Sequence, residues 1–364
     1  MLNSMYSGIS GLNANQRKLD VIGNNIANSG TTAFKASSVT FQDSMYQTIR
    51  SASSPSLNLG GTNPAQVGLG VSVQGINVNM NQGSLQPTGR PLDLAIDQKG
   101  YFIIAKGPEE AETGKKSITV DEVTHTMKSD TMEPYFTRDG AFKLDPKGNL
   151  INSNGYRVMG YAVSGTVQLP NNTTATSKVP AYDGVKDTAD TYDKFKYVDP
   201  DAKDFSADGK ELVALRIPES VQVQVKDPTN PSNLTAKDIK IQSFSIEKDG
   251  VIKAVLADGS TTALGQVARA SFNNEIGLKQ VGQNMYTPST NSGNPMLRAG
   301  KGATAANDNS KAYGDIVQGS LEMSNVDLAA QFTDMIIASR SFQANSKIIS
   351  TGDEILQELV NLKR

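Results

Sequence analysis

Several residue types are missing or scarce in this chain, and each absence excludes a kind of chemistry. The 364 residues contain no cysteine, no tryptophan and only one histidine. Without cysteine there are no disulfides and no thiolate metal sites, and one class of catalytic nucleophile is excluded. The single histidine, His125, lies in a polar stretch and has no second histidine with which to share a metal ion. We therefore expect no catalytic site, no cofactor site and no metal site.

Clustered charge and long apolar runs are also absent. The chain carries 35 Lys and Arg against 37 Asp and Glu, which gives a net charge of -2. Nucleic acids and anionic membranes bind clustered positive charge, so we expect neither as a partner. No apolar stretch approaches the length of about 18 residues that a membrane span needs. The N-terminus lacks a basic region followed by an apolar core, so we expect no cleaved secretory signal peptide.

What the chain does have is an apolar repeat near each end. The first repeat has a three-four spacing, broken at Gln16 and Gly23, and consists of Leu2, Met5, Ile9, Leu12, Leu19 and Ile26. The second recurs at every seventh residue, at Leu328, Met335, Phe342, Ile349 and Leu356. Such repeats are typical of helices that pack lengthwise against another helix. We predict helices over residues 3–28 and from Ser324 to about Leu362, and we assign their apolar repeats to assembly of the protein.

Two asparagines near the end of the first predicted helix allow two interpretations. Asn24 and Asn28 are four residues apart and therefore share one helix face. In the first interpretation their side chains only cap the fraying end of the helix. In the second, buried amides fix the register of the following segment or of a neighbouring helix. Both interpretations stay open, and both asparagines are counted as candidate assembly residues.

The residues between the two helices are expected to form β-structure. Short apolar runs alternate with turn signals such as Asp139-Gly140 and Asn154-Gly155. Residues 31–70 lack a clean period and are expected to form an extended linker that packs on another part of the protein. Residues 165–210 are poor in apolar residues, which indicates an insertion into the β-structure.

The expected fold class is α+β, with paired, coiled-coil-like terminal helices, a discontinuous and mainly β inner domain, and a small inserted β-rich outer domain. The expected boundaries place residues 1–30 and 325–364 in the helical assembly domain and residues 31–70 in the linker. Residues 71–162 and 239–324 would form the inner domain, and residues 163–238 the outer domain.

Several motifs resemble those of bacterial flagellar rod and hook proteins. The N-terminal signature extends from Leu19 to Lys35 and contains Ile22-Gly23-Asn24-Asn25-Ile26-Ala27-Asn28-Ser29. The C-terminal signature begins at Glu322-Met323-Ser324-Asn325-Val326-Asp327-Leu328 and continues to Leu362. Inner motifs that match are Gly89-Arg90-Pro91-Leu92-Asp93-Leu94-Ala95-Ile96 and Tyr135-Phe136-Thr137-Arg138-Asp139-Gly140-Ala141-Phe142. The matching parts follow the expected order and cover roughly two thirds of the chain, whereas residues 163–238 carry no such motif.

The resemblance implies a structural protein without catalysis, which polymerises into a hollow helical tube with its terminal helices lining the channel. Within the family the hook proteins are the most similar. Their tube is curved and acts as a universal joint that carries motor torque to the filament. The resemblance also implies export through the flagellar type III apparatus to an extracellular position. The implied partners are further copies of the chain, the distal rod protein, the hook cap, the hook–filament junction proteins and the export apparatus.

Two other interpretations stay open. The stretch Met45-Tyr46-Gln47-Thr48-Ile49-Arg50, with the Ser- and Pro-rich residues after it, is similar to an insert typical of the distal rod protein. That protein forms a straight drive shaft, and the inserted outer lobe counts against it here. The other interpretation is a secreted adhesive or binding protein, in which paired terminal helices would have no purpose.

Overall fold

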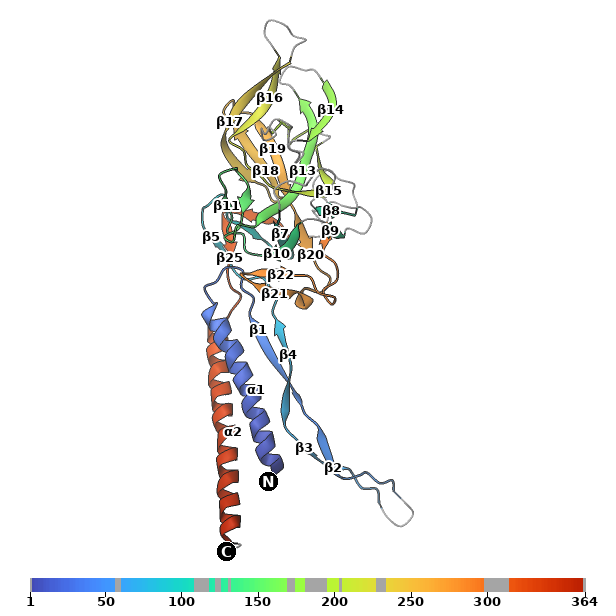
Figure 1. Ribbon diagram of the computed structural model, residues 1–364, viewed down its shortest axis with the longest axis vertical. Coiled ribbons are helices and arrows are strands. Elements are labelled where there is room, and N and C mark those ends of the chain that lie inside the picture. The colour runs from blue at the N-terminus through green and yellow to red at the C-terminus, as the bar shows by residue number, and fades with distance from the viewer. Residues whose placement is uncertain are drawn as a thin grey trace. The chain divides into compact units, whose positions relative to one another are not determined.

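The computed structural model describes residues 2–55, 60–107, 118–121, 126–129, 132–168, 174–180, 195–202, 205–226, 234–297 and 314–362. The chain divides into two compact units, one of residues 1–81 and 324–364 and the other of residues 82–323. Between two long terminal helices the described chain is mostly β-structure (Figure 1), which confirms the coarse fold prediction. His125 lies outside the described residues.

The first unit contains both helices. Helix α1 spans Leu2–Ala27 and helix α2 spans Leu328–Leu362, so both lie within a few residues of the predicted ranges. The predicted start of α2 at Ser324 is wrong, because the helix begins only after Asp327. The Asp327 carboxylate accepts hydrogen bonds from the backbone N–H groups of Ala329 and Ala330, at 2.9 and 3.2 Å. In the described part of the chain, neither helix has the length and apolar character needed to cross a bilayer.

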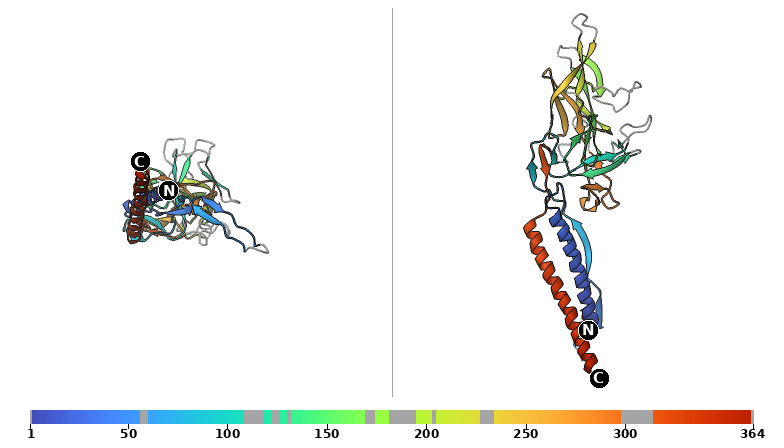
Figure 2. Two further views of the ribbon diagram at one scale, coloured as in Figure 1. Left: turned by 90° about the horizontal axis from the view of Figure 1, so that it is seen from below. Right: turned by 60° about the vertical axis from the view of Figure 1, so that its left-hand side comes forward.

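The same unit contains four strands, of which the sequence predicted only the last, from Val71. They are β1 (Ser37–Asp43), β2 (Tyr46–Arg50), β3 (Ala65–Gly68) and β4 (Val71–Val78). β1 pairs antiparallel with β4, and β2 pairs antiparallel with β3. β1 and β4 also lie against α1, as Figure 2 shows from a second side. The segment expected to be a linker is therefore mostly paired strand, and Val71–Val78, which was expected to begin the inner domain, belongs to the helical unit.

The second unit is built from short antiparallel strands. In chain order they are β5 (Leu85–Pro87), β6 (Leu94–Ile96), β7 (Tyr101–Lys106), β8 (Ile118–Val120), β9 (Met127–Ser129), β10 (Glu133–Thr137), β11 (Lys143–Leu144), β12 (Leu150–Ile151), β13 (Arg157–Gln168), β14 (Thr174–Pro180), β15 (Ser206–Ala214), β16 (Ser220–Lys226), β17 (Leu234–Ile246), β18 (Val251–Leu256), β19 (Thr261–Val267), β20 (Arg269–Ser271), β21 (Lys279–Gly282), β22 (Met285–Thr287), β23 (Met296–Leu297), β24 (Ile316–Gln318) and β25 (Ser320–Glu322). A short 3-10 helix, η1 (Glu275–Gly277), precedes β21. In the hydrophobic core of the second unit, Phe102 and Phe142 meet edge to face, with ring centroids 5.2 Å apart.

The expected boundaries of the outer domain fall inside continuous strands. The boundary after residue 162 lies within β13, and the boundary after residue 238 lies within β17. The sequence placed both boundaries at a change in composition, whereas the backbone ladder continues across that change. Where an inner lobe ends and an outer lobe begins therefore stays a prediction.

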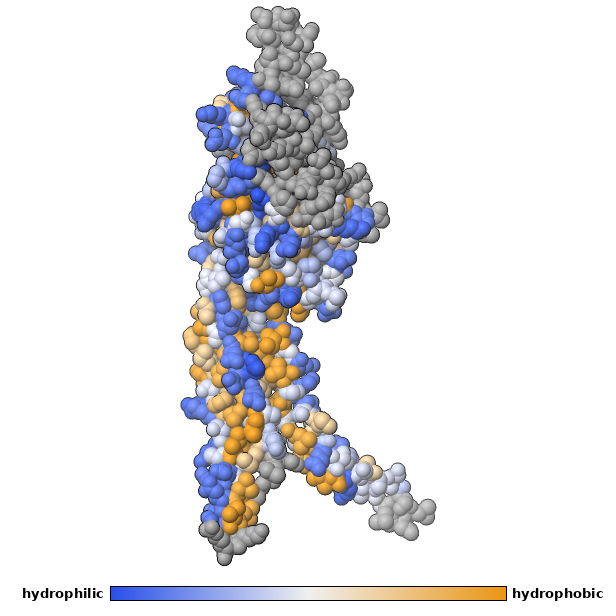
Figure 3. All heavy atoms as spheres, viewed as in Figure 1, coloured by the Kyte–Doolittle hydropathy of each residue, from blue (hydrophilic) through white to orange (hydrophobic). Residues whose placement is uncertain are grey.

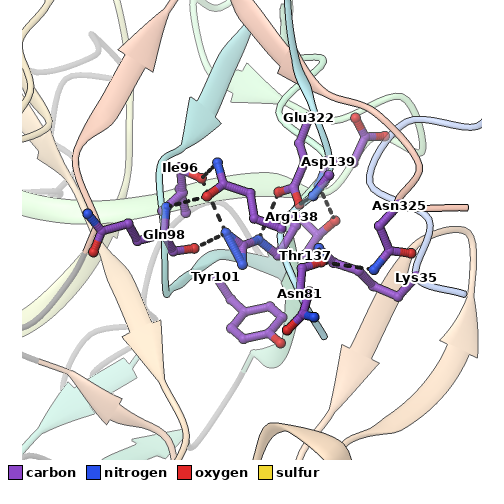
Figure 4. Close-up of polar contacts among 12 residues, drawn as sticks. Lys35, Asn81, Ile96, Gln98, Tyr101, Thr137, Arg138, Asp139, Glu322 and Asn325 are labelled. Atoms are coloured by element: carbon purple, nitrogen blue, oxygen red, sulfur yellow. Dashed lines mark hydrogen bonds and ion pairs between the residues drawn. The ribbon is translucent and has the colours of Figure 1, made fainter. Parts of the chain in front are cut away.

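A buried ion pair joins distant segments of the second unit. Arg138 Nε lies 2.9 Å from Glu322 Oε2, and both side chains are almost fully buried. The Arg138 guanidinium also donates to the backbone oxygens of Ile96 and Gln98, and Glu322 Oε1 accepts from Gly83 N–H at 3.0 Å. Figure 4 shows the Arg138 contacts in close-up. These bonds hold the segment at Gly83, which enters the unit, beside the segment at Glu322, which leaves it. A charged pair in the interior is stable only when its polar atoms also have hydrogen-bond partners.

Candidate assembly surface of the terminal helices

The two terminal helices pack against each other in antiparallel orientation. At one end Asn25 of α1 meets Gln331 of α2, and at the other end Met5 lies against Gly352. Between them, Lys18 Nζ and Asp334 Oδ1 form an ion pair of 2.9 Å. The contact between α1 and α2, which we call the seam, thus runs along most of α1. The predicted pairing of the terminal helices is present within one chain.

Glycines bring the helices of the seam close together. A Cβ atom at Gly11 would lie 2.6 Å from the side-chain nitrogen of Asn345, and one at Gly8 would lie 3.2 Å from Ile349 Cγ1. Any larger side chain at Gly11 would therefore displace Asn345. Glycine inside a helix costs about 1 kcal/mol relative to alanine, so its presence here is explained by the close approach of α2.

Asn25 is the buried amide that links the helices to the following strand. Its side chain is only 1% exposed. Its Nδ2 donates to Ser37 O at 2.8 Å and to Gln331 Oε1 at 3.0 Å, while its Oδ1 accepts from Ser37 N–H at 3.0 Å. One side chain thus fixes the start of β1 and one turn of α2 relative to α1.

Asn24 and Asn28 have only local contacts. Asn24 is exposed, and Asn28 Nδ2 donates to the backbone oxygen of Asn24 at 3.0 Å. Asn28 Oδ1 accepts from the Thr31 hydroxyl at 3.1 Å. For these two residues the capping interpretation agrees with the geometry, whereas the register-fixing role belongs to the residue between them. The signal that was available is spacing: Gly11, Ala14, Lys18, Ile22 and Asn25 follow a three-four rhythm.

The predicted apolar residues of α1 lie beside the seam. Met5, Leu12, Leu19 and Ile26 are half-buried and Ile9 is exposed, whereas the fully buried positions of α1 include Gly11, Ala14, Ile22 and Asn25. The side chain of Leu2 lies outside the described residues. The repeat thus identified the helix correctly but placed its packed side about a quarter-turn away.

The predicted heptad of α2 winds around the helix. A straight α-helix drifts by about 20° for every seven residues, so a strict heptad does not stay on one side. Ile349, half-buried, faces Gly8 in the seam, and Leu356 is half-buried, whereas Leu328 at the other end is 43% exposed. Met335 is half-buried, and Phe342 is 37% exposed. Ala338, which is buried, and Asn345, which is half-buried, are among the seam residues that the heptad missed.

Much apolar surface of the helices stays exposed in a single chain. The exposed members of α2 are Leu328, Phe332, Ile336, Ile337, Phe342, Ile348, Ile355, Leu359, Val360 and Leu362. Figure 3 shows apolar residues extending over this part of the molecule. Contiguous apolar surface of this kind marks an interaction site in a soluble protein. These exposed side chains of α2 could be buried by packing against another apolar helix.

A second asparagine anchors the start of α2 within the first unit. Asn325 Nδ2 donates to the backbone oxygens of Asn79 and Asn81, at 2.8 and 2.9 Å, and its Oδ1 accepts from Ala36 N–H at 2.7 Å. Lys35, 1% exposed, donates from Nζ to Asn81 O at 2.8 Å (Figure 4). Both residues lie in the terminal signatures that the sequence comparison singled out. Their contacts join the chain after α1, the chain after β4 and the chain before α2.

Three protein-family models match the chain. The model described as flagella basal body rod protein matches residues 5–35. The model of the flagellar hook protein FlgE/F/G D1 domain matches residues 124–180. The model of the C-terminal region of the flagellar basal body rod FlgEFG proteins matches residues 317–362. The two terminal matches cover most of α1 and all of α2.

Individual relatives are similar over the full length. The flagellar basal-body rod protein FlgG of Bacillus subtilis is 38% identical over 365 aligned positions, covering 100% of both chains. The flagellar hook protein FlgE of Borreliella burgdorferi is 29% identical over 473 positions, again covering 100% of both. The hook protein FlgE of Escherichia coli is 27% identical and covers 98% of both. The crystal structure of Helicobacter pylori flagellar hook protein FlgE2 overlaps 65% of this chain and 100% of that chain, at 12% identity and a TM-score of 0.37.

Proposed function

This chain belongs to the family of bacterial flagellar hook and rod proteins, and we propose that it is the structural subunit of the hook. It polymerises into a curved hollow tube that acts as a universal joint and transmits motor torque to the filament. The observation that carries this proposal is the apolar surface that α2 leaves exposed in a single chain. Relatives named as hook proteins, which align over the length of this chain, support the choice of the hook.

The terminal helices make the contacts between subunits. In the tube, the apolar residues of α1 and α2 pack against the helices of neighbouring copies around the channel. The candidate assembly residues stay those of the two repeats, together with Asn24 and Asn28. Burial of an apolar side chain such as Phe342 stabilises each contact by about 1.5–3 kcal/mol. Many small contributions of this size, repeated in every copy, hold a polymer together.

The position in the cell follows from the same proposal. The subunit is exported through the flagellar type III apparatus without a cleaved signal peptide and is assembled outside the cytoplasm. Its partners are other copies of itself, the distal rod protein, the hook cap and the hook–filament junction proteins. The residues expected to form the outer domain, 163–238, form a peripheral lobe. The family consists of structural proteins, in agreement with a subunit that carries no catalytic site.

A straight distal rod is the second candidate, and two observations favour it. The alignment with the rod protein FlgG of Bacillus subtilis needs 365 positions for the 364 residues of this chain. The alignment with the Borreliella burgdorferi hook protein needs 473 positions, so that hook protein contains many residues without a counterpart here. The exposed hairpin of β2 and β3 lies where the sequence resembles the insert typical of the distal rod protein.

Electron microscopy of flagella purified from the source bacterium tests the proposal. An epitope tag in the outer lobe, detected with gold-labelled antibody, should label the curved segment between the basal body and the filament. Deletion of the gene should remove that segment and abolish swimming. Labelling of the straight rod inside the basal body would favour the second candidate, and labelling away from the flagellum would contradict both.

A further inference from the structure

α2 carries two apolar flanks that α1 does not cover. Flank A lies in the first half of the helix and consists of Leu328, Phe332, Ile336 and Phe342, which are 37–62% exposed. Flank B lies mainly in the second half and consists of Ile337, Ile348, Ile355 and Leu359, which are 46–54% exposed. The two flanks are therefore offset along the helix axis.

The flanks lie on opposite sides of α2. At 3.6 residues per turn, flank A lies about a quarter-turn from the seam around the axis of α2, and flank B lies about a quarter-turn from it in the other direction. The seam is fixed by Ala338, Asn345 and Ile349, which are buried or lie against α1. A two-fold contact would use the same surface on both copies, whereas two different surfaces on opposite sides suit a head-to-tail contact that repeats without closing.

The side of α2 opposite the seam, which we call the back face, carries a separated charge pattern. Arg340 and Lys347 lie toward its middle, and Glu354 and Glu358 lie toward its end, all of them exposed. Among the described residues, none of the four belongs to an ion pair. The basic pair and the acidic pair are therefore available to a second copy. They lie 7–18 residues apart, so at about 1.5 Å per residue a neighbouring helix shifted by roughly 10–27 Å along the axis would bring its basic pair level with the acidic pair.

We propose that α2 of one copy docks in parallel against α2 of the next copy, shifted along the helix axis by roughly 20–27 Å. In this arrangement flank B of one copy lies against flank A of the next. The back faces of the two copies then lie side by side, with Glu354 and Glu358 of one copy next to Arg340 and Lys347 of the following copy. The inference rests on the proposed self-assembly. It specifies that α2 of a second copy covers the exposed surface, and it specifies the axial register between the two helices. Because the charges are exposed, the register is sensitive to salt.

Cysteine cross-linking tests the axial shift between copies. Because the natural chain has no cysteine, disulfides can form only between the introduced cysteines. In the full chain, Phe332→Cys and Ile348→Cys are combined, the protein is polymerised, and copper-phenanthroline is added. The two positions lie roughly 24 Å apart within one helix, too far for a disulfide within the chain. A ladder of linked copies on a non-reducing gel is the expected result. Dimers formed by Ile348→Cys alone, or a polymer without a ladder, would overturn the proposal.

Charge exchange tests the register by a second route. Arg340→Glu with Lys347→Glu should raise the concentration needed for polymerisation about tenfold at low salt, because attraction becomes repulsion. Glu354→Lys with Glu358→Lys should do the same, and all four changes together should restore polymerisation. Lys99→Glu with Lys143→Glu, in the second unit, is the control of equal charge. An equal loss in that control, or no recovery in the fourfold variant, would overturn the register.

These outcomes separate the inference from the function on which it rests. If the cysteine variants fail to polymerise, the charge exchange decides the matter. Variants that form tubes but fail both tests overturn the stagger and leave the structural role of the protein intact. Absence of the wild-type chain from purified flagella would instead contradict the proposed function.

Discussion

At the scale of single residues, polar side chains fix the geometry of the helical unit. Asn25 binds the backbone of Ser37 at the start of β1, and Asn325 binds backbone groups of segments far away in the sequence. An asparagine buried in a helix contact selects one register, because any other register leaves its amide without partners. Apolar side chains lack this selectivity. The helices are therefore aligned by a few amides, while their apolar surface stays available.

Replacing Asn25 tests this role. In the full chain, Asn25→Ala leaves the N–H and the carbonyl of Ser37 without their partner. We expect a loss of about 1–3 kcal/mol in the stability of the first unit, because buried polar groups would lose their hydrogen bonds. Asn24→Ala, at the exposed neighbouring position, is the matched control. Hydrogen exchange at the Ser37 amide measures the effect, and equal exchange in both variants would refute it.

Two buried tyrosines make the second unit sensitive to alkali. Burial raises the pKa of Tyr286 to about 12, and burial together with the nearby Glu275 carboxylate raises the pKa of Tyr101. The unfolded chain loses these protons near pH 10, before the folded chain does. Stability is therefore lost as the pH rises from about 10 through 12.

Tyr286→Phe removes one of these titrating groups. We expect the variant to lose less stability than the wild type between about pH 10 and 12, while remaining within about 1 kcal/mol of it at pH 8. Denaturant melts of the full chain at a series of pH values provide the comparison. Parallel pH profiles for the two proteins would show that Tyr286 does not ionise on unfolding.

Substitutions at Phe342, which is exposed, and at Ile349, which packs against α1, distinguish an effect on assembly from an effect on folding. Phe342→Asp and Ile349→Asp should both block assembly and swimming while export continues, because each places a charge in a helix contact. Ile349 lies against Gly8, so its replacement should also loosen the seam, whereas Phe342→Asp should leave the monomer intact. Circular dichroism of the monomer and electron microscopy of the polymer distinguish the two effects. Normal motility in either variant would count against assembly through these helices.

At the scale of elements, the sequence predicts the helices well and the strand pairing poorly. The heptad revealed α2 because apolar periodicity is a local signal, although the drift of a straight helix moved Leu328 away from the seam. Turn signals are equally local, and Asn154-Gly155 does form a turn, with Gly155 at a φ of 81°. The pairing of Val39 with Ile76 was not predictable, because it joins residues distant in the sequence. Asn25 belongs to the same signature as Asn24 and Asn28 but was not chosen as a candidate, because the apolar repeat does not show which of these amides lies on the packed side.

The hairpin of β2 and β3 leaves its side chains in solvent. Met45, Tyr46 and Ile49 are 56–74% exposed, and a two-stranded hairpin is marginally stable alone. Such an element gains stability by lying against another surface, so we expect it to pack on neighbouring subunits in the tube. There it would limit how easily the tube bends.

Deletion of residues 50–66 tests the hairpin. We expect tubes that still form, because both terminal helices are retained. They should bend more easily, because a shortened hairpin can no longer hold Met45, Tyr46 and Ile49 against neighbouring subunits. The persistence length of single tubes, obtained from electron micrographs or from thermal bending, gives the answer. Replacement of the same residues by a Gly/Ser segment of equal length controls for chain length. Unchanged stiffness in the deletion would assign the hairpin no mechanical role.

At the scale of the whole molecule, assembly depends on surface that one chain cannot bury. The first unit contains both helices, whose seam occupies one side of α2 and leaves flanks A and B exposed. The second unit has its own buried core, including Phe102, Phe142 and Ile252, and closes around the Arg138–Glu322 pair. The exposed helices are therefore expected to drive polymerisation, while the β-structured unit folds around its own core.

Removal of both terminal helices tests whether they drive polymerisation. A chain lacking residues 1–28 and 326–364 is compared with the full chain by sedimentation and electron microscopy under conditions in which the full chain forms tubes. We expect the truncated chain to be a soluble monomer that retains the β-structure of the second unit and forms no tubes at any concentration tested. Tubes formed by the truncated chain would contradict the account, because the main contacts would then lie in the β-structured unit.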